Sequence, residues 1–148
     1  MKFLTRDMIE TNFNASNAEE AIIRAGKLLL NEGGIDKIYI DAMLDSYKNN
    51  GPYFVLSPKI AMPHARPEDG VNEASVSLVK LDKPVKFGHM TNDPVSLVFG
   101  LGATSGDEHL ELLQKLTVLL NTTEKTDALL SADNVDEIIQ IIEKRNVL

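Results

Sequence analysis

The chain has 148 residues, no cysteine, and a formal net charge of −7. This length suits one domain over residues 1–148, large enough to bury its own core. The lack of cysteine excludes disulfides and thiol nucleophiles and favours a cytoplasmic location. The acidic charge argues against a nucleic-acid partner. The short apolar runs argue against membrane insertion and an export signal.

Helical periodicity predicts two helices in the first third of the chain. The first begins near Asn17, which forms a capping-box pattern with Glu20, and Gly33-Gly34 ends it. The second runs from about residue 36 to 49 and stops at Gly51-Pro52.

The middle third has the pattern of short strands. Runs of branched and aromatic residues predict strands over 53–56, 74–81 and 95–99. The nearly continuous apolar character of 95–99 predicts burial on both faces. No internal repeat, low-complexity segment or linker is present.

The last third is helical. Leucines at helical spacing predict a helix over 108–120, followed by a short helix over 126–130. A final helix over 134–144 begins with Asn134 and Glu137 as a second cap. Helices before and after a set of strands predict an α/β fold in which helices cover a sheet.

The segment IAMPHARPEDG at 60–70 is the first candidate site, because it holds His64 between Pro63 and Pro67 in a short stiff loop. A neutral imidazole is a nucleophile at cellular pH. Arg66 lies close enough in sequence to neutralise a phosphoryl oxygen. The alternatives are a turn histidine that hydrogen-bonds the backbone and a solvated surface arginine.

His109 is the second candidate. It shares a helical face with Leu112, Leu113 and Leu116 and lies at the N-terminal end of that face. A neutral imidazole at a positive helix end would help to hold an anion. The alternative is a histidine at the edge of the core, satisfied by one hydrogen bond.

A glycine-rich stretch, GLGATSG at 100–106, lies between a predicted strand and a predicted helix. This layout is typical of a phosphate cradle, in which groups of Gly102, Thr104 and Ser105 could support a phosphoryl group. The stretch lacks the G-x-G-x-x-G spacing and a P-loop lysine, which disfavours a nucleotide site. A flexible connection is the alternative.

His89 lies among turn residues and is predicted to be exposed. Zinc ligation by His64, His89 and His109 is formally possible, but no two of them share a helix at ligand spacing. We therefore expect no metal ion and no cofactor.

The segment Ile60-Ala61-Met62-Pro63-His64 resembles the active-site motif of phosphotransferase-system (PTS) enzyme IIA components (EIIA) of the mannitol–fructose type. The resemblance covers about residues 14–146. It is closest to the ascorbate-specific branch, on the segments 51–56, 63–71 and 92–95. The rest of the chain agrees in order, with the Asn-x-x-Glu helix start and Ala42-Met43-Leu44-Asp45 before this motif, and Phe87-Gly88 and Glu108-His109-Leu110 after it.

The resemblance implies a layered sandwich in which a mixed β-sheet is flanked by helices on both sides. It also implies a phosphotransferase. His64, with His109 as its neighbour, would accept a phosphoryl group from phospho-HPr and pass it to a cysteine of a cognate EIIB. A membrane EIIC would be an indirect partner, reached through EIIB. The ascorbate-specific branch suggests L-ascorbate as the carbohydrate.

Two positions depart from the mannitol–fructose pattern. That pattern has an arginine where this chain has Ser46-Tyr47-Lys48, and a glycine where it has Ala65. Arg66 or Lys48 is our candidate for the replacement charge.

Two other functions are compatible with the same residues. One is a regulatory module of the same fold, in which phosphorylation of His64 switches binding to a regulator or transporter. The other is a metal-dependent hydrolase that uses the three histidines. The sequence leaves open the sugar, the strand order, the reacting ring nitrogen of His64, and whether the chain forms a homodimer.

Overall fold

The computed structural model describes residues 1–144. Within them the strands are β1 (Lys2–Phe3), β2 (Ile9–Phe13), β3 (Ile60–Ala61), β4 (Ser75–Val85) and β5 (Val95–Gly102). The helices are α1 (Ala18–Asn31), α2 (Lys37–Asn50), α3 (Gly106–Leu120), α4 (Thr123–Ser131) and α5 (Val135–Lys144), with 3-10 turns η1 (Arg6–Met8) and η2 (Pro67–Asp69).

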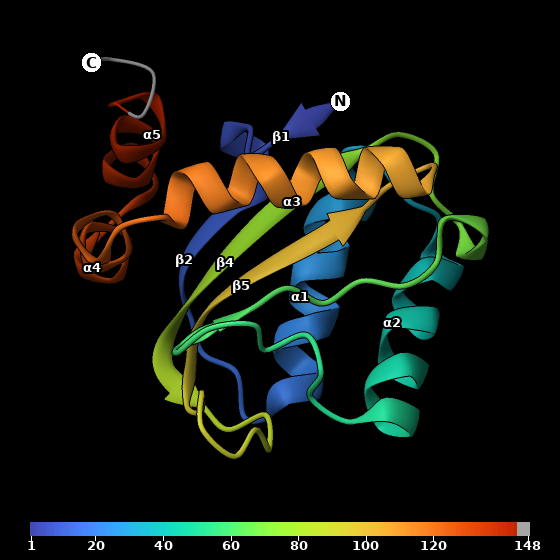
Figure 1. The fold of residues 1–148 in the computed structure, drawn as a ribbon, viewed down its shortest axis with the longest axis horizontal. Coiled ribbons are helices and arrows are strands. Elements are labelled where there is room, and N and C mark those ends of the chain that lie inside the picture. Colours follow the sequence, from blue (N-terminus) through green and yellow to red (C-terminus); the bar gives the residue numbers. More distant parts are fainter. Residues whose placement is uncertain (145–148) are drawn as a thin grey trace.

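The strands form one five-stranded mixed sheet (Figure 1). Its centre is the antiparallel pair of β4 and β5. Both β1 and β2 run parallel to β4 along its other edge, while β3 runs parallel to β5. The sheet is therefore mixed, as predicted.

Helices cover both faces of this sheet, so the predicted layered α/β sandwich is confirmed (Figure 1). Side chains of β4 and β5 alternate between the two faces. Val79 and Val98 join the core under α1 and α2. Leu78 and Phe99 join the core under α3, α4 and α5.

The predicted strand over 53–56 is wrong. These residues form a turn after α2, in which the N–H of Val55 donates to the carbonyl of Pro52 at 3.0 Å. Phe54 and Val55 are fully buried, so their apolar character reflects core packing rather than pairing in a sheet. A short apolar run does not distinguish the two. The strand of this region is β3, a few residues later.

Strands β4 and β5 extend beyond their predicted ends, and β1 and β2 are not among the predicted elements. The β4–β5 register shifts between Lys80 and Val85, and this irregularity lets Pro84 lie within a strand. Gly102 is part of β5 rather than of a loop. A Cβ at Gly102 would lie 3.1 Å from a methyl of Ile35, so glycine lets these two residues pack closely.

Helices α1, α3 and α5 begin with the same arrangement. The side chain of the capping residue accepts from the N–H of a glutamate three residues later, at 2.9–3.1 Å. That glutamate accepts from the N–H of the residue before the cap, at 2.7–2.8 Å. The predicted caps at Asn17 and Asn134 are confirmed, with the reciprocal bond one residue earlier than in a capping box.

Within residues 1–144, no helix is both long and apolar enough to cross a membrane.

Candidate active site

His64 lies in the loop that leaves β3, and the backbone on both sides of it is fixed. The N–H of Met62 donates to the carbonyl of Phe54 at 2.9 Å. The carbonyl of Pro63 accepts from the N–H of Leu101 in β5 at 3.1 Å. These bonds hold the loop against the sheet edge, while the His64 side chain remains partly exposed.

One hydrogen bond determines the chemistry of the His64 ring. Nδ1 lies 2.8 Å from the carbonyl oxygen of Met62. A carbonyl can only accept, so Nδ1 carries the hydrogen, and in the neutral ring the lone pair is on Nε2. The backbone contact expected of a turn histidine is thus present, and it leaves Nε2 as the ring nitrogen with a free lone pair.

The first turn of α3 brings His109 against His64. The two ring centroids are 4.9 Å apart and the planes are inclined at 47°. Burial, and secondarily the nearby His64, lower the pKa of His109 below its ordinary value, so its ring is neutral at pH 7. Among the described residues neither ring nitrogen of His109 forms a hydrogen bond, so its N–H is available to an anion on His64.

Tyr39 of α2 joins the His64 loop to β5 through its hydroxyl. Its buried hydroxyl donates to the carbonyl of Leu101 at 2.7 Å and accepts from the N–H of Ala65 at 2.8 Å. Burial raises the pKa of this phenol, so it stays protonated. The sequence reasoning did not identify Tyr39, since its helical spacing is that of a core residue.

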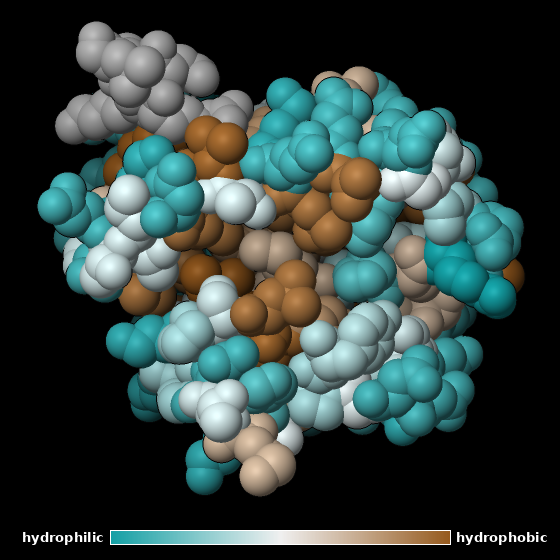
Figure 2. Space-filling view, in the orientation of Figure 1, coloured by the Kyte–Doolittle hydropathy of each residue, from teal (hydrophilic) through white to brown (hydrophobic). Residues whose placement is uncertain are grey.

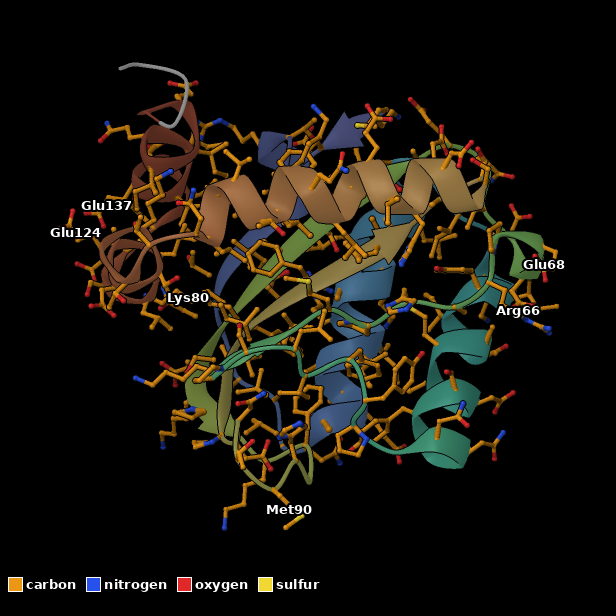
Figure 3. All side chains as sticks on the ribbon, viewed as in Figure 1. Arg66, Glu68, Lys80, Met90, Glu124 and Glu137 are labelled. Carbon is orange, nitrogen blue, oxygen red and sulfur yellow. The ribbon has the colours of Figure 1, made fainter. Side chains whose placement is uncertain are left out.

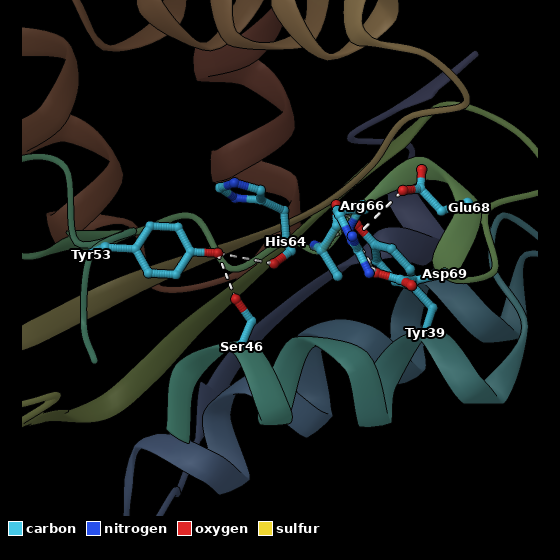
Figure 4. A network of polar contacts seen from close by, with 8 residues as sticks. Tyr39, Ser46, Tyr53, His64, Arg66, Glu68 and Asp69 are labelled. Carbon is cyan, nitrogen blue, oxygen red and sulfur yellow. Dashed lines mark hydrogen bonds and ion pairs between the residues drawn. The ribbon is translucent and has the colours of Figure 1, made fainter. Parts of the chain in front are cut away.

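Tyr53 is a second residue that the sequence does not mark as functional, because the run 53–56 has the pattern of a strand. Its ring stands edge-on to that of His64, with centroids 5.7 Å apart and an interplanar angle of 79°. Its hydroxyl lies 2.8 Å from Oγ of Ser46 on α2 and 3.5 Å from the carbonyl oxygen of His64 (Figure 4).

Arg66 lines the same open groove as His64, a space of about 620 Å³ between the loop and α2 that also borders Asp45, Ser46, Tyr53 and Asp69. Its guanidinium pairs with Glu68 and Asp69, each at 3.6 Å, and its side chain is 78% exposed (Figure 3). Figure 4 shows the guanidinium and the imidazole of His64 pointing to different sides of the loop. Lys48, the other candidate cation, is exposed on α2.

The three residues predicted to support a phosphoryl group have other contacts in the structure. Gly102 pairs with Ser75 inside the sheet. Oε1 of Glu108 accepts from both the N–H and the hydroxyl of Thr104, at 2.7 and 2.5 Å. Ser105 caps α3. Thr104 and Ser105 thus build the helix start that carries His109.

His89 lies in the loop between β4 and β5, next to the 98% exposed Met90 (Figure 3). Its Nδ1 accepts from the N–H of Asn92 at 3.0 Å. Within residues 1–144, no three His, Cys, Asp or Glu side chains are grouped so that they could hold a metal ion.

Two large apolar side chains, one after α2 and one in α3, are exposed. Leu56 is 54% exposed and Leu110, which follows His109, is 58% exposed. Figure 2 shows apolar side chains gathered below α3 on this face. Apolar side chains that gather on an exposed face are typical of protein contact surfaces.

Comparison with known families gives the class of protein. Residues 2–145 match the family described as phosphoenolpyruvate-dependent sugar phosphotransferase system, EIIA 2. The chain therefore belongs to this EIIA family, whose members are phosphotransferase relay proteins. The predicted family and enzyme class are confirmed.

Individual relatives agree with this assignment. The chain is 34% identical over 139 residues to the ascorbate-specific PTS EIIA component of Escherichia coli K12, covering 93% of this chain and 90% of that one. The solution structure of the mannitol-specific cryptic enzyme IIA of E. coli is 36% identical, with a TM-score of 0.86 over 95% of both chains.

A further solved structure bears on partners. It is the complex of the E. coli mannitol enzyme IIA with phosphorylated enzyme IIB. The IIA chain in it is 30% identical to this one, with a TM-score of 0.84 over 95% of this chain and 98% of that one. Together the matches confirm the predicted EIIA fold.

Proposed function

We propose that this chain is a cytoplasmic phosphocarrier that accepts a phosphoryl group from phospho-HPr on Nε2 of His64 and passes it to a cysteine of a cognate EIIB. The observation that carries the proposal is the His64 ring itself. Its Nδ1 is bonded to the carbonyl of Met62, its Nε2 keeps the lone pair, and it is partly exposed beside His109.

In the first step the Nε2 lone pair forms a bond to phosphorus, and the bond from phosphorus to HPr breaks with its electron pair left on HPr. In the second step a cysteine thiolate of EIIB attacks the same phosphorus, and the electron pair of the N–P bond returns to Nε2. The hydrogen on Nδ1 of His64 stays in place throughout and keeps donating to the carbonyl of Met62. Because little covalent work is required of the protein, positioning and charge stabilisation dominate catalysis.

His109 is the group best placed to stabilise the phosphoryl charge, by donating its N–H to a phosphoryl oxygen. Its place in the first turn of α3 adds the positive end of the helix dipole. Arg66 gives further charge support by leaving its exposed acidic partners and turning into the groove it lines. Thr104 and Ser105 contribute by fixing the start of α3, and Gly102 by close packing of β5.

The donor test uses phosphorylated HPr carrying a labelled phosphoryl group. We expect an acid-labile, alkali-stable label on the wild type and on His89→Ala, a control that removes a histidine outside the site. We expect no label on His64→Ala. Persistence of label in His64→Ala would overturn the assignment.

For the sugar we propose L-ascorbate, on the segments that resemble the ascorbate-specific branch and on the 34% identity to an ascorbate-specific EIIA component. The test offers the labelled carrier to ascorbate-type and mannitol-type EIIB proteins. Faster transfer to the ascorbate-type EIIB is expected, and preference for the mannitol type would overturn the sugar. Label retained with every EIIB would instead support a regulatory module.

A further inference from the structure

Tyr53 belongs to neither core of the molecule, yet its position is closely defined. It is 43% exposed, in the turn after α2. Its ring packs edge-on to Phe54 on one side, with centroids 5.3 Å apart, and to His64 on the other at 5.7 Å. Its hydroxyl is bonded to Ser46. Holding a partly exposed tyrosine in one rotamer costs side-chain entropy, and the contacts with Phe54, His64 and Ser46 have to offset that cost.

Among residues 1–144 the His64 imidazole forms one hydrogen bond, to the carbonyl of Met62, and a ring held by one bond can still rotate about it. Two rings limit this motion. His109 lies against it at 4.9 Å, and Tyr53 stands nearly perpendicular to it at 79°. Tyr53 also reaches the His64 carbonyl with its hydroxyl, so it contacts both the ring and the backbone of the same residue (Figure 4).

We propose that Tyr53 is a positioning residue for His64, and that Ser46 holds Tyr53 in place. The pair ties the active-site loop to α2 and keeps Nε2 facing the incoming phosphorus. This inference rests on the proposed function, since it concerns the same transfer. It adds two side chains, from the turn at 53 and from α2, that act through His64 without touching the phosphoryl group.

The test compares single-hydroxyl deletions in phosphoryl transfer from phospho-HPr. Tyr53→Phe keeps the ring and the apolar contact area, and we expect the rate at saturating phospho-HPr to fall about 5- to 10-fold with KM unchanged. Ser46→Ala should lower it in the same direction. The double variant should be no slower than Tyr53→Phe, because the two hydroxyls act as one unit.

Tyr47→Phe is the matched control. It removes another hydroxyl from α2, one that donates to the carbonyl of Phe87 at 2.6 Å and does not contact His64. We expect it to alter stability while leaving the transfer rate at the wild-type value. A fall equal to that of Tyr53→Phe would mean that hydroxyl loss acts through α2 as a whole, and would overturn the inference.

Nitrogen NMR of unphosphorylated His64 supplies a readout that a purely structural role would not move. The wild type should show the Nδ1–H tautomer, and Tyr53→Leu should show averaged tautomers together with a transfer rate reduced about 10- to 100-fold. A wild-type rate and tautomer in Tyr53→Leu would overturn the inference, as would a raised KM with an unchanged saturating rate. If the wild type takes no label, the proposed function fails, while the tautomer comparison still tests Tyr53.

Discussion

The His109 ring lies against His64, so the charge of His109 depends on what His64 carries. Two imidazolium rings with centroids 4.9 Å apart would repel, and partial burial further disfavours the charged form of His109. The unphosphorylated site is therefore most stable with His109 neutral. A phosphoryl group on His64 would reverse this balance, because a nearby negative charge favours the protonated ring.

The lowered pKa of His109 predicts how stability depends on pH. Between its pKa in the folded chain and the value of roughly 6.5 in the unfolded chain, the unfolded state binds more protons. The free energy of unfolding should therefore fall as pH drops below about 6.5, down to the folded-state pKa. His109→Gln should flatten this decline in denaturant titrations, whereas His89→Gln should not. Equal slopes for wild type and His109→Gln would contradict the prediction.

At the scale of secondary structure, α3 differs from the other capped helices in what its first turn carries. α1, α3 and α5 share one pattern of cap and glutamate. Only α3 has a candidate active-site residue, His109, within its first turn. The hydrogen bonds that form the start of α3 therefore also fix the position of the His109 ring against His64.

Two cap deletions separate these roles. Asn17→Ala in α1 and Ser105→Ala in α3 should each lower the free energy of unfolding by about 1 kcal/mol. Only Ser105→Ala should also slow phosphoryl transfer, because it loosens the turn that carries His109. Denaturant titration and transfer kinetics on both variants check this. A comparable slowing in Asn17→Ala would show that the transfer rate follows general stability instead.

At the scale of the whole molecule, β4 and β5 connect two cores. Each strand sends alternate side chains to the α1–α2 face and to the α3–α5 face. Both cores share one sheet, so unfolding of the helices on one face would expose apolar side chains of the strands that also support the other core. The described fold is therefore expected to unfold as one unit.

Leu116→Ala tests this unity. Leu116 is fully buried in the core under α3, and its truncation should lower the free energy of unfolding by about 2–5 kcal/mol. All three tyrosines, Tyr39, Tyr47 and Tyr53, lie in or next to α2, on the other side of the molecule. Tyrosine fluorescence and circular dichroism should shift to the same new midpoint. A fluorescence midpoint that stays at the wild-type value would reveal two independent units.

Local patterns in the sequence were sufficient for the helices and for the family, and they pointed to His64 as the candidate reactive group. Helix starts at Asn17 and Asn134 follow from hydrogen bonds within one turn, and leucine spacing marks the buried side of α3. The stiff Pro-His loop and the motif around His64 indicated a nucleophile and the EIIA family. All of these depend on residues a few positions apart.

Tertiary contacts decided the rest. The turn at 53–56 is apolar because Phe54 enters the core, and only the packed molecule distinguishes such a turn from a strand. Thr104 and Ser105 form hydrogen bonds at the start of α3. Tyr53 contacts the His64 ring and Tyr39 bonds the backbone of Ala65, although both lie outside the motif at 60–64. Hydrogen bonds between residues that are dozens of positions apart depend on how helices and strands pack. The spacing of residues along the chain does not specify that packing.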